Sequence, residues 1–444
     1  MADVKKHFLD FNKKSGFYFS RVLNRPFVPP ELLQISITHR CPLRCKMCSV
    51  VKVQSKLKEE MTTEEMKSVI DQACDMGIRE FYLTGGEPFI RKDFFEIINY
   101  AGQRGMNTFV NTSGLLIDQK TAEKIVDSSL FDLTFSIDGL EKTHDFLRGP
   151  GVFSKAITAI KEINRLKSEK GKTSPRINIL TIIMNQNLAD IIPLVRFAED
   201  LGISGVHFQP LLVDNSKMFV RDQKNVFWIP PDKLGQLELL IRQLNEYKKY
   251  SKVDLIFDAK LLMDYFSRKL KHHNKCFVGY NRLFIGLWGN VGLVCPVDSR
   301  NFAFLESFRK KTLSEIWNSE KAKEARYAVK SCKKECVQGC ALMPEAEDLK
   351  KIYRTALKSF LMEAPHNHET IDFLNFINEN LSYYESMLSA HKESESLRKE
   401  NKTDLKEIEN TLKIVSWITN DIKKRIMRFS EAVPQLKQQN STNL

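Results

Sequence analysis

A regular alternation of apolar strands and amphipathic helices is the feature that most limits the fold of this 444-residue chain. Apolar runs and period-two patterns predict strands at residues 33–37, 80–83, 108–110, 131–136, 177–183 and 205–209. Amphipathic helices are expected between them, at residues 62–77, after Asp93, at 153–167 and at 188–201. Because each parallel pairing needs a long crossover, this order predicts an α/β fold with about six β/α units. The alternation alone does not separate an incomplete barrel from an open doubly wound sheet.

Three cysteines follow the first expected strand. The segment THRCPLRCKMC places Cys41, Cys45 and Cys48 at a C-x3-C-x2-C spacing. Such a loop can bind three irons of a [4Fe-4S] cluster and leaves the fourth iron without a protein ligand. That open iron can chelate the amino and carboxylate groups of S-adenosylmethionine (SAM). The alternatives are a zinc site, which prefers four ligands, and a ferredoxin-like cluster, which uses a fourth nearby cysteine.

Together with the Gly85-Gly86-Glu87-Pro88 segment after the next strand, this spacing resembles the radical SAM superfamily. The resemblance implies a partial (β/α)6 TIM-type barrel. It also implies an enzyme that cleaves SAM reductively at the cluster held by Cys41, Cys45 and Cys48. The resulting 5'-deoxyadenosyl radical would abstract hydrogen from a substrate. Gly85 and Gly86 would let the backbone approach the methionine moiety of SAM, and Glu87 would accept from its amino group.

Two further segments, FSIDG and HDFLRG, resemble motifs of a subgroup with additional C-terminal clusters. The resemblance implies that Ser136 and Asp138 lie near bound SAM and that Arg148 pairs with its carboxylate. A helix N-cap at Asp138 or an ion pair between Asp145 and Arg148 would explain the same residues structurally. Four other polar residues are weaker candidates because they follow strands whose ends should face the site; these are Asn111, Thr112, Ser113 and Asn185.

A second cysteine group lies beyond the expected barrel and comprises Cys276, Cys295, Cys332, Cys336 and Cys340. It resembles the auxiliary-cluster extensions called SPASM and twitch, although a full SPASM module has seven cysteines and a twitch module has four. We expect at least one auxiliary [4Fe-4S] cluster that uses Cys276, Cys295 and two of the last three cysteines. Two clusters and a zinc site stay open as alternatives. The ninth cysteine, Cys74, lies in an expected helix and reads as a buried structural residue.

The pattern divides the chain into four parts: an aromatic lead-in at 1–30, the core barrel at 31–230, a connection with the auxiliary-cluster module at 231–344, and a helical extension at 345–444. The last helix repeats apolar residues in steps of three and four, at Leu405, Ile408, Leu412, Val415, Thr419, Ile422, Ile426 and Phe429. This seam predicts packing within the chain or a dimer contact. A membrane-surface helix or a partner protein would also use such a seam.

The chain carries 68 Lys and Arg against 55 Asp and Glu, a net charge of +13, spread without a dominant block. We therefore expect a solvated basic surface and no DNA partner, while peripheral membrane contact stays open. The charged start and the lack of a long apolar run predict a cytoplasmic protein, in which cysteines favour metal ligation over disulfides.

The substrate is expected to be a peptide or a small molecule, and a flavodoxin- or ferredoxin-type protein to donate the electron. The short segment 1–30 leaves no room for an N-terminal peptide-binding domain. Two other functions stay open: a radical SAM enzyme that acts on a lipid or polyprenyl phosphate, and a non-catalytic iron-sulfur protein for electron transfer or scaffolding.

Overall fold

The described part of the chain forms two compact units. The computed structural model describes residues 2–48, 50, 60–211, 226–269, 276–293, 303–332, 349–350, 353–354, 368–398 and 402–441. We call residues 29–273 and 281–339 the sheet unit, and residues 1–28, 274–280 and 340–444 the helical unit. Each is described by itself.

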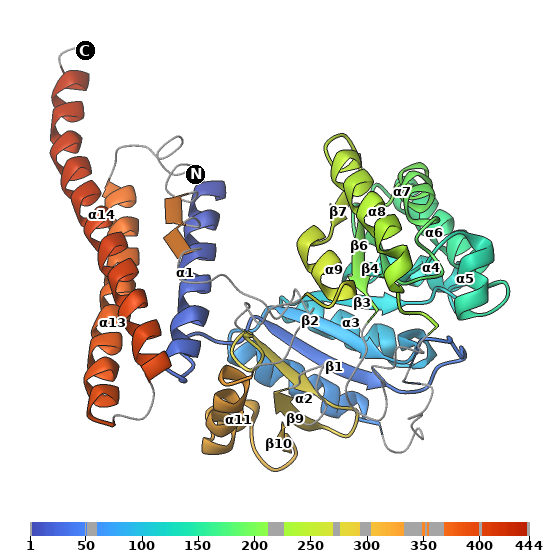
Figure 1. The fold of residues 1–444 in the computed structure, drawn as a ribbon, viewed down its shortest axis with the longest axis horizontal. Coiled ribbons are helices and arrows are strands. Elements are labelled where there is room, and N and C mark those ends of the chain that lie inside the picture. Colours follow the sequence, from blue (N-terminus) through green and yellow to red (C-terminus); the bar gives the residue numbers. More distant parts are fainter. Residues whose placement is uncertain are drawn as a thin grey trace. The chain divides into compact units, whose positions relative to one another are not determined.

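In the sheet unit, strands and helices alternate in the predicted order (Figure 1). The repeats comprise β1 (Leu32–Thr38), α2 (Thr63–Asp75), β2 (Glu80–Gly85), the 3-10 helix η3 (Pro88–Ile90), α3 (Phe94–Gln103), β3 (Asn107–Thr112), α4 (Gln119–Asp127), β4 (Leu130–Ser136), α5 (Glu141–Arg148), α6 (Val152–Glu169), β5 (Arg176–Ile183), α7 (Ile191–Asp200) and β6 (Gly205–Pro210). The later elements are η4 (Pro231–Lys233), α8 (Leu234–Tyr247), β7 (Asp254–Ile256), α9 (Ala259–Phe266), β8 (Arg282–Ile285), β9 (Asn290–Leu293), β10 (Ala303–Ser307), α10 (Leu313–Trp317) and α11 (Glu320–Lys330).

The strands form one open sheet in the order β10-β9-β8-β1-β2-β3-β4-β5-β6-β7. Strands β1 to β7 pair in parallel in chain order, which confirms the α/β fold and the partial barrel. On the other side of β1, β8 pairs in parallel, and β9 and β10 continue antiparallel. The strands of the cysteine-bearing module therefore extend the sheet of the barrel. The described sheet does not close, because β7 and β10 lie at opposite ends of the order.

Local sequence signals explain where the first repeat begins and ends. The Thr62 side chain accepts from the backbone of Glu65, whose side chain in turn accepts from the backbone of Thr62. This capping box fixes the start of α2 as predicted. Gly77, with a φ of 86°, follows the C-cap of the helix. The apolar face of α2 is buried in the main core through Met66, Val69, Ile70 and Ala73.

The helical unit contains α1 (Ala2–Val22), α13 (His368–Arg398) and α14 (Lys402–Ser441) (Figure 1). Its core collects the lead-in aromatics with apolar residues of both long helices: Phe11, Phe17, Tyr18, Phe19, Leu374, Ile377, Leu381, Ile408, Val415 and Ile422. The Tyr18 hydroxyl lies 3.0 Å from Thr411 Oγ1. From Ile408 to Ile422, the heptad seam of the last helix therefore packs within the chain, against α1 and α13.

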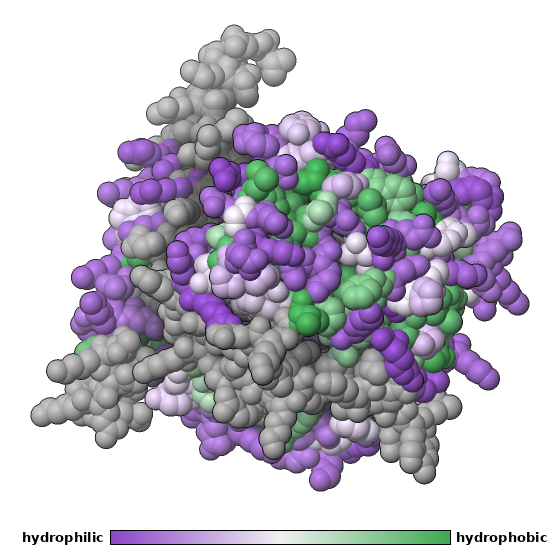
Figure 2. Space-filling view, turned by 45° about the vertical axis from the view of Figure 1, so that its right-hand side comes forward, coloured by the Kyte–Doolittle hydropathy of each residue, from purple (hydrophilic) through white to green (hydrophobic). Residues whose placement is uncertain are grey.

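Where Figure 2 colours the described residues, hydrophilic side chains cover most of the surface, with hydrophobic side chains gathered in patches between them. None of the described helices is both long enough and apolar enough to cross a membrane.

Candidate active site

A cavity of about 340 Å³ lies in the sheet unit, at the carboxyl ends of the parallel strands. The loop after β1 contributes Cys41, Leu43, Cys45, Met47, Cys48 and Val50. The later strands and the segments that follow them contribute Thr84, Gly85, Gly86, Glu87, Asn111, Thr112, Ser113, Ser136, Ile182, Gln209, Pro210 and Leu211, and the end of α5 contributes Arg148. Parallel strands bring their carboxyl ends to one edge, so segments from distant parts of the sequence meet there. Most of the residues expected at the site lie around this cavity.

The three cysteines of the first group line the cavity together. Two backbone bonds hold their loop: Cys48 N donates to Cys45 O over 3.1 Å, and Lys46 N donates to Leu147 O over 2.9 Å. Burial raises the pKa of Cys41, and it raises the pKa of Cys45 to about 11. The positive charge of Arg148 acts in the opposite direction on Cys45 and favours its thiolate.

These cysteines fit a cluster better than a single metal ion. Among the described residues, no three His, Cys, Asp or Glu side chains converge as one ion would require. In a [4Fe-4S] cube each thiolate binds a different iron, so the three sulfur atoms need not converge on one point. The cavity beside them supplies the room for such a group.

The glycines of the second motif pack against the cysteine loop. Gly86 N donates to Thr38 O over 2.6 Å, and Glu87 N donates to Arg40 O over 3.0 Å. A Cβ atom at Gly85 would lie 2.1 Å from Thr38 O, and one at Gly86 would lie 2.1 Å from Arg40 O. Gly85 also has a φ of 123°. The chain itself thus requires glycine at both positions, a reason that the sequence pattern did not indicate.

Glu87 lines the cavity but is almost completely buried, with 1% of its surface exposed. Its carboxylate accepts from Thr112 Oγ1 at 2.8 Å, from Ser113 N at 2.9 Å and from Ser113 Oγ at 2.6 Å. Burial raises the pKa of Glu87, and the hydrogen bonds from Ser113 and Thr112 oppose that rise. The backbone of Phe89 also hydrogen-bonds to this carboxylate and lowers its pKa. A carboxylate has about four acceptor positions, so these contacts together engage it fully.

Ser136 and Arg148 line the cavity, whereas Asp138 lies behind it with no exposed surface. Arg148 Nε donates to Asp138 Oδ2 over 2.6 Å, and Ile182 N donates to Asp138 Oδ1 over 2.9 Å. His144 Nδ1 lies 3.2 Å from Asp138 N and accepts from it. Burial lowers the pKa of His144 to about 4, and the charge of Arg148 acts in the same direction.

Both structural alternatives for this motif are wrong. The residue that caps α5 is Leu140, and its backbone N donates to Asp190, so Asp138 is not the cap. Asp145 accepts from the backbone of Gly151 and Phe153 at the start of α6 and does not pair with Arg148.

The weaker candidates separate into two groups. Asn111, Thr112 and Ser113 line the cavity at the end of β3. Asn185 lies away from it, and its Nδ2 donates to Val226 O over 3.4 Å. Sequence reasoning missed Thr84 and Gln209, which line the cavity; their positions at the ends of β2 and β6 were the available signal.

Of the second cysteine group, Cys276 and Cys332 lie in the described residues, and Cys295, Cys336 and Cys340 lie outside them. Cys276 belongs to the helical unit, where its carbonyl accepts from Arg21 Nε over 3.0 Å. Cys332 follows α11 in the sheet unit. Cys74 is partly buried in α2, and burial raises its pKa.

Comparison with known proteins identifies two domains. Residues 35–198 match the radical SAM superfamily, and residues 276–341 match the SPASM iron-sulfur cluster-binding domain. A PqqA peptide cyclase from Bradyrhizobium diazoefficiens is 26% identical over 66% of this chain and 74% of its own length. An AdoMet-dependent heme synthase from Methanosarcina barkeri is 28% identical over 65% of this chain and 82% of its own.

The fold is similar to that of SuiB from Streptococcus suis in its complex with SAM, with a TM-score of 0.55 and 18% identity. The likeness covers 69% of this chain and 73% of SuiB.

Proposed function

We propose a specific site and mechanism for this chain, which belongs to the radical SAM superfamily and carries a SPASM domain. Cys41, Cys45 and Cys48 would hold a [4Fe-4S] cluster with one open iron. When bound, this group supplies the electron that cleaves SAM to a 5'-deoxyadenosyl radical, which takes hydrogen from the substrate. One observation carries the proposal: the three cysteines share a single cavity with the glycine motif and Arg148.

The cysteines must lose their protons to bind iron, because thiolates are the ligands. Burial disfavours that loss at Cys41 and Cys45. Arg148 opposes this effect at Cys45, where its charge favours the thiolate.

The polar residues of the cavity match the two charged groups of SAM. Arg148, held by Asp138, presents a positive charge for the carboxylate, with Ser136 as a neighbouring donor. Glu87 lines the same cavity and supplies an acidic group that would face the ammonium group. Met47, Ile182 and Leu211 form an apolar part of the lining, which suits the less polar parts of SAM or the substrate and excludes water.

An auxiliary [4Fe-4S] cluster that uses Cys276, Cys295 and two of the last three cysteines would accept the electron left after substrate oxidation, or bind substrate. The matched SPASM domain begins at Cys276 and supports this assignment. The substrate is a peptide or a small molecule, since the relatives include a peptide cyclase and a heme synthase. A flavodoxin- or ferredoxin-type donor would supply the electron.

A lipid substrate has less support than the sequence suggested. Four aromatic side chains of the lead-in are buried in the helical unit and so do not present an apolar surface to a membrane: Phe11, Phe17, Tyr18 and Phe19. The seam residues Ile408, Val415 and Ile422 of α14 are likewise buried in this core.

The proposal is tested by reconstituting the chain anaerobically with iron and sulfide, reducing it with dithionite, and measuring 5'-deoxyadenosine formed from SAM. The triple variant Cys41→Ala, Cys45→Ala, Cys48→Ala should form none, while Cys74→Ala should match the wild type. Product formation by the triple variant would refute the assignment. No product from the wild type, with iron bound, would favour a non-catalytic iron-sulfur protein.

A further inference from the structure

Two buried charged side chains lie beside the cysteine loop without lining the cavity. The side chains of Glu60 and Arg91 are only 1% and 5% exposed, and Glu60 Oε2 lies 3.7 Å from Arg91 Nη1. Neither belongs to the motifs that resemble the family. Buried charges are costly unless they are paired, so their contacts indicate what they hold in place.

Glu60 binds the residues that directly precede Cys41. Its Oε1 accepts from Thr38 Oγ1 at 2.5 Å and from Arg40 Nε at 2.9 Å. Its Oε2 accepts from Arg40 Nη2 at 3.0 Å, so carboxylate and guanidinium form a bidentate pair. Thr38 Oγ1 also accepts from Arg40 N over 3.0 Å. The stem of the cysteine loop, residues 38–40, is therefore bound to one buried carboxylate.

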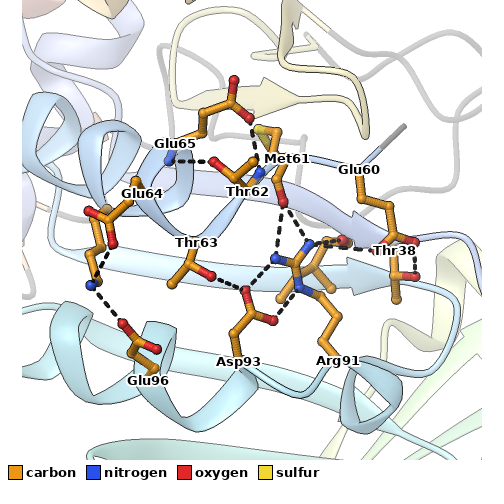
Figure 3. A network of polar contacts seen from close by, with 12 residues as sticks. Thr38, Glu60, Met61, Thr62, Thr63, Glu64, Glu65, Arg91, Asp93 and Glu96 are labelled. Atoms are coloured by element: carbon orange, nitrogen blue, oxygen red, sulfur yellow. Dashed lines mark hydrogen bonds and ion pairs between the residues drawn. The ribbon is translucent and has the colours of Figure 1, made fainter. Parts of the chain in front are cut away.

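Arg91 fixes the neighbourhood of Glu60. Its Nη1 donates to Ile37 O and to Met61 O, each over 3.1 Å. Its Nε and Nη2 donate to the two carboxylate oxygens of Asp93, over 2.9 and 2.6 Å. In Figure 3 the Arg91 side chain lies between Met61 and Asp93, with Glu60 and Thr38 close by. The network joins the end of β1, the segment before α2 and the segment after the glycine motif.

The stem is bound by a second set of contacts as well. Gly86 N and Glu87 N donate to the carbonyl oxygens of Thr38 and Arg40. Glu60 holds the side chains of the same two residues. Backbone and side chains of the stem are thus fixed independently, which leaves little freedom in where the chain enters the cysteine loop.

We propose that Glu60 is a positioning residue for the iron-sulfur cluster: through Arg40 and Thr38, supported by Arg91, it sets where the Cys41 thiolate meets its iron. The inference rests on the proposed cluster at Cys41, Cys45 and Cys48, and it adds a buried ionic support to that site. Partners that orient metal ligands in this way typically change metal affinity by about 10- to 100-fold when removed.

The test uses the full chain and the variant Glu60→Gln, which keeps the size of the side chain and removes its charge. After reconstitution and reduction, the readout is the electron paramagnetic resonance signal that changes on addition of SAM. This readout reports the open-iron cluster separately from an auxiliary cluster. In the presence of a ferrous chelator, we expect Glu60→Gln to lose this signal about tenfold faster than the wild type.

The matched control is Glu65→Gln, the same substitution five positions along the chain. Glu65 binds Arg309 and the backbone of Thr62 and has no hydrogen bond with the loop stem. It should lose the signal at the wild-type rate. Should Glu60→Gln fail to fold by circular dichroism, Arg40→Lys replaces it, because lysine keeps the charge and loses the bidentate geometry. Arg40→Lys should then show the faster loss.

The inference is overturned if folded Glu60→Gln, or Arg40→Lys in its place, keeps the SAM-sensitive signal for as long as the wild type. It is also overturned if the auxiliary signal decays equally fast, because Glu60 would then support the fold as a whole. A wild-type chain that binds iron but gives no SAM-sensitive signal would instead refute the proposed function.

Discussion

Arg148 and Asp138 form an ion pair beside the cavity, with 2.6 Å between Nε and Oδ2. The sequence motif indicated that both residues belong to the site, but it could not tell which carboxylate Arg148 binds. Asp145 is only three residues from Arg148 in the sequence, whereas Asp138 lies ten residues before it, between β4 and α5, and meets it only in the folded chain. Asp138 thus acts on the cavity through Arg148.

The variant Asp138→Asn should destabilise the protein by about 3 kcal/mol, because it leaves the buried guanidinium of Arg148 without its charged partner. It should also weaken SAM binding, measured by titration of the reconstituted protein. Urea unfolding of the metal-free chain gives the free energy of unfolding. Asp145→Asn is the control and should lower the free energy of unfolding by only about 1 kcal/mol, because the amide oxygen keeps one of the two hydrogen bonds that Asp145 accepts at the start of α6. Equal costs for the two variants would contradict the pairing.

The burial of His144 predicts a pH dependence of stability. Its pKa falls from 6.5 to about 4 on folding, so the unfolded chain takes up the proton more readily. The neutral side chain therefore makes its full contribution to the free energy of unfolding above pH 6.5. This contribution is lost as the pH falls toward 4, by about 3 kcal/mol in all. In the wild type, the free energy of unfolding should rise with pH between about pH 4.5 and 6.5. In His144→Gln this rise should be shallower, by the slope that corresponds to up to about one proton taken up on unfolding. An unchanged slope would contradict the assignment.

At the scale of elements, the strands and most helices of the β/α repeats could be predicted because hydrophobic periodicity and caps are local signals. Helix α4 was not among the expected helices. Helix α5 was recognised only as a motif, since its eight residues carry few periodic positions. The pairing of β8 with β1 could not be predicted, because it joins residues 282–285 to residues 32–35 through tertiary contacts alone. The close approach of the glycine motif to the cysteine loop could not be predicted either, because it too is a tertiary contact.

That close approach predicts the effect of Gly86→Ala. The added Cβ would meet Arg40 O and must push the two loops apart, at a cost of about 2 kcal/mol. The amount of iron bound after reconstitution should also fall, because the cysteine loop is displaced. Gly235→Ala is the control, because nothing lies within 4 Å of a Cβ at that position in α8. Wild-type iron content in Gly86→Ala would show that the contact has no role in holding the loop.

At the scale of the whole molecule, the helical unit combines both ends of the chain with the segment that carries Cys276. Its helices α1 and α14 lie outside the matched family regions, yet Arg21 of α1 binds the carbonyl of Cys276 and pairs with Glu407 of α14 at 3.4 Å. Periodicity predicted the seam of α14 but not its partners, because α1 and α14 are separated by most of the sequence. An auxiliary cluster that uses Cys276 would therefore depend on this unit.

Arg21→Met should lower the iron bound by the auxiliary module and leave 5'-deoxyadenosine formation in place, because the first cluster lies in the other unit. Iron per chain and product per chain are measured on the same sample. Arg25→Met is the control, because Arg25 stacks on the ring of Phe27, whereas it is Arg21 that binds the carbonyl of Cys276. If Arg21→Met and Arg25→Met bind the same iron as the wild type, the helical unit does not support the auxiliary cluster.

The measurement that tests the central claim most directly is the paramagnetic resonance spectrum of the reduced, reconstituted chain before and after SAM is added. An iron left open by Cys41, Cys45 and Cys48 binds SAM directly, so the account predicts a changed spectrum in the wild type and none in the triple alanine variant. An identical spectrum with and without SAM, in protein that holds its full iron, would contradict it.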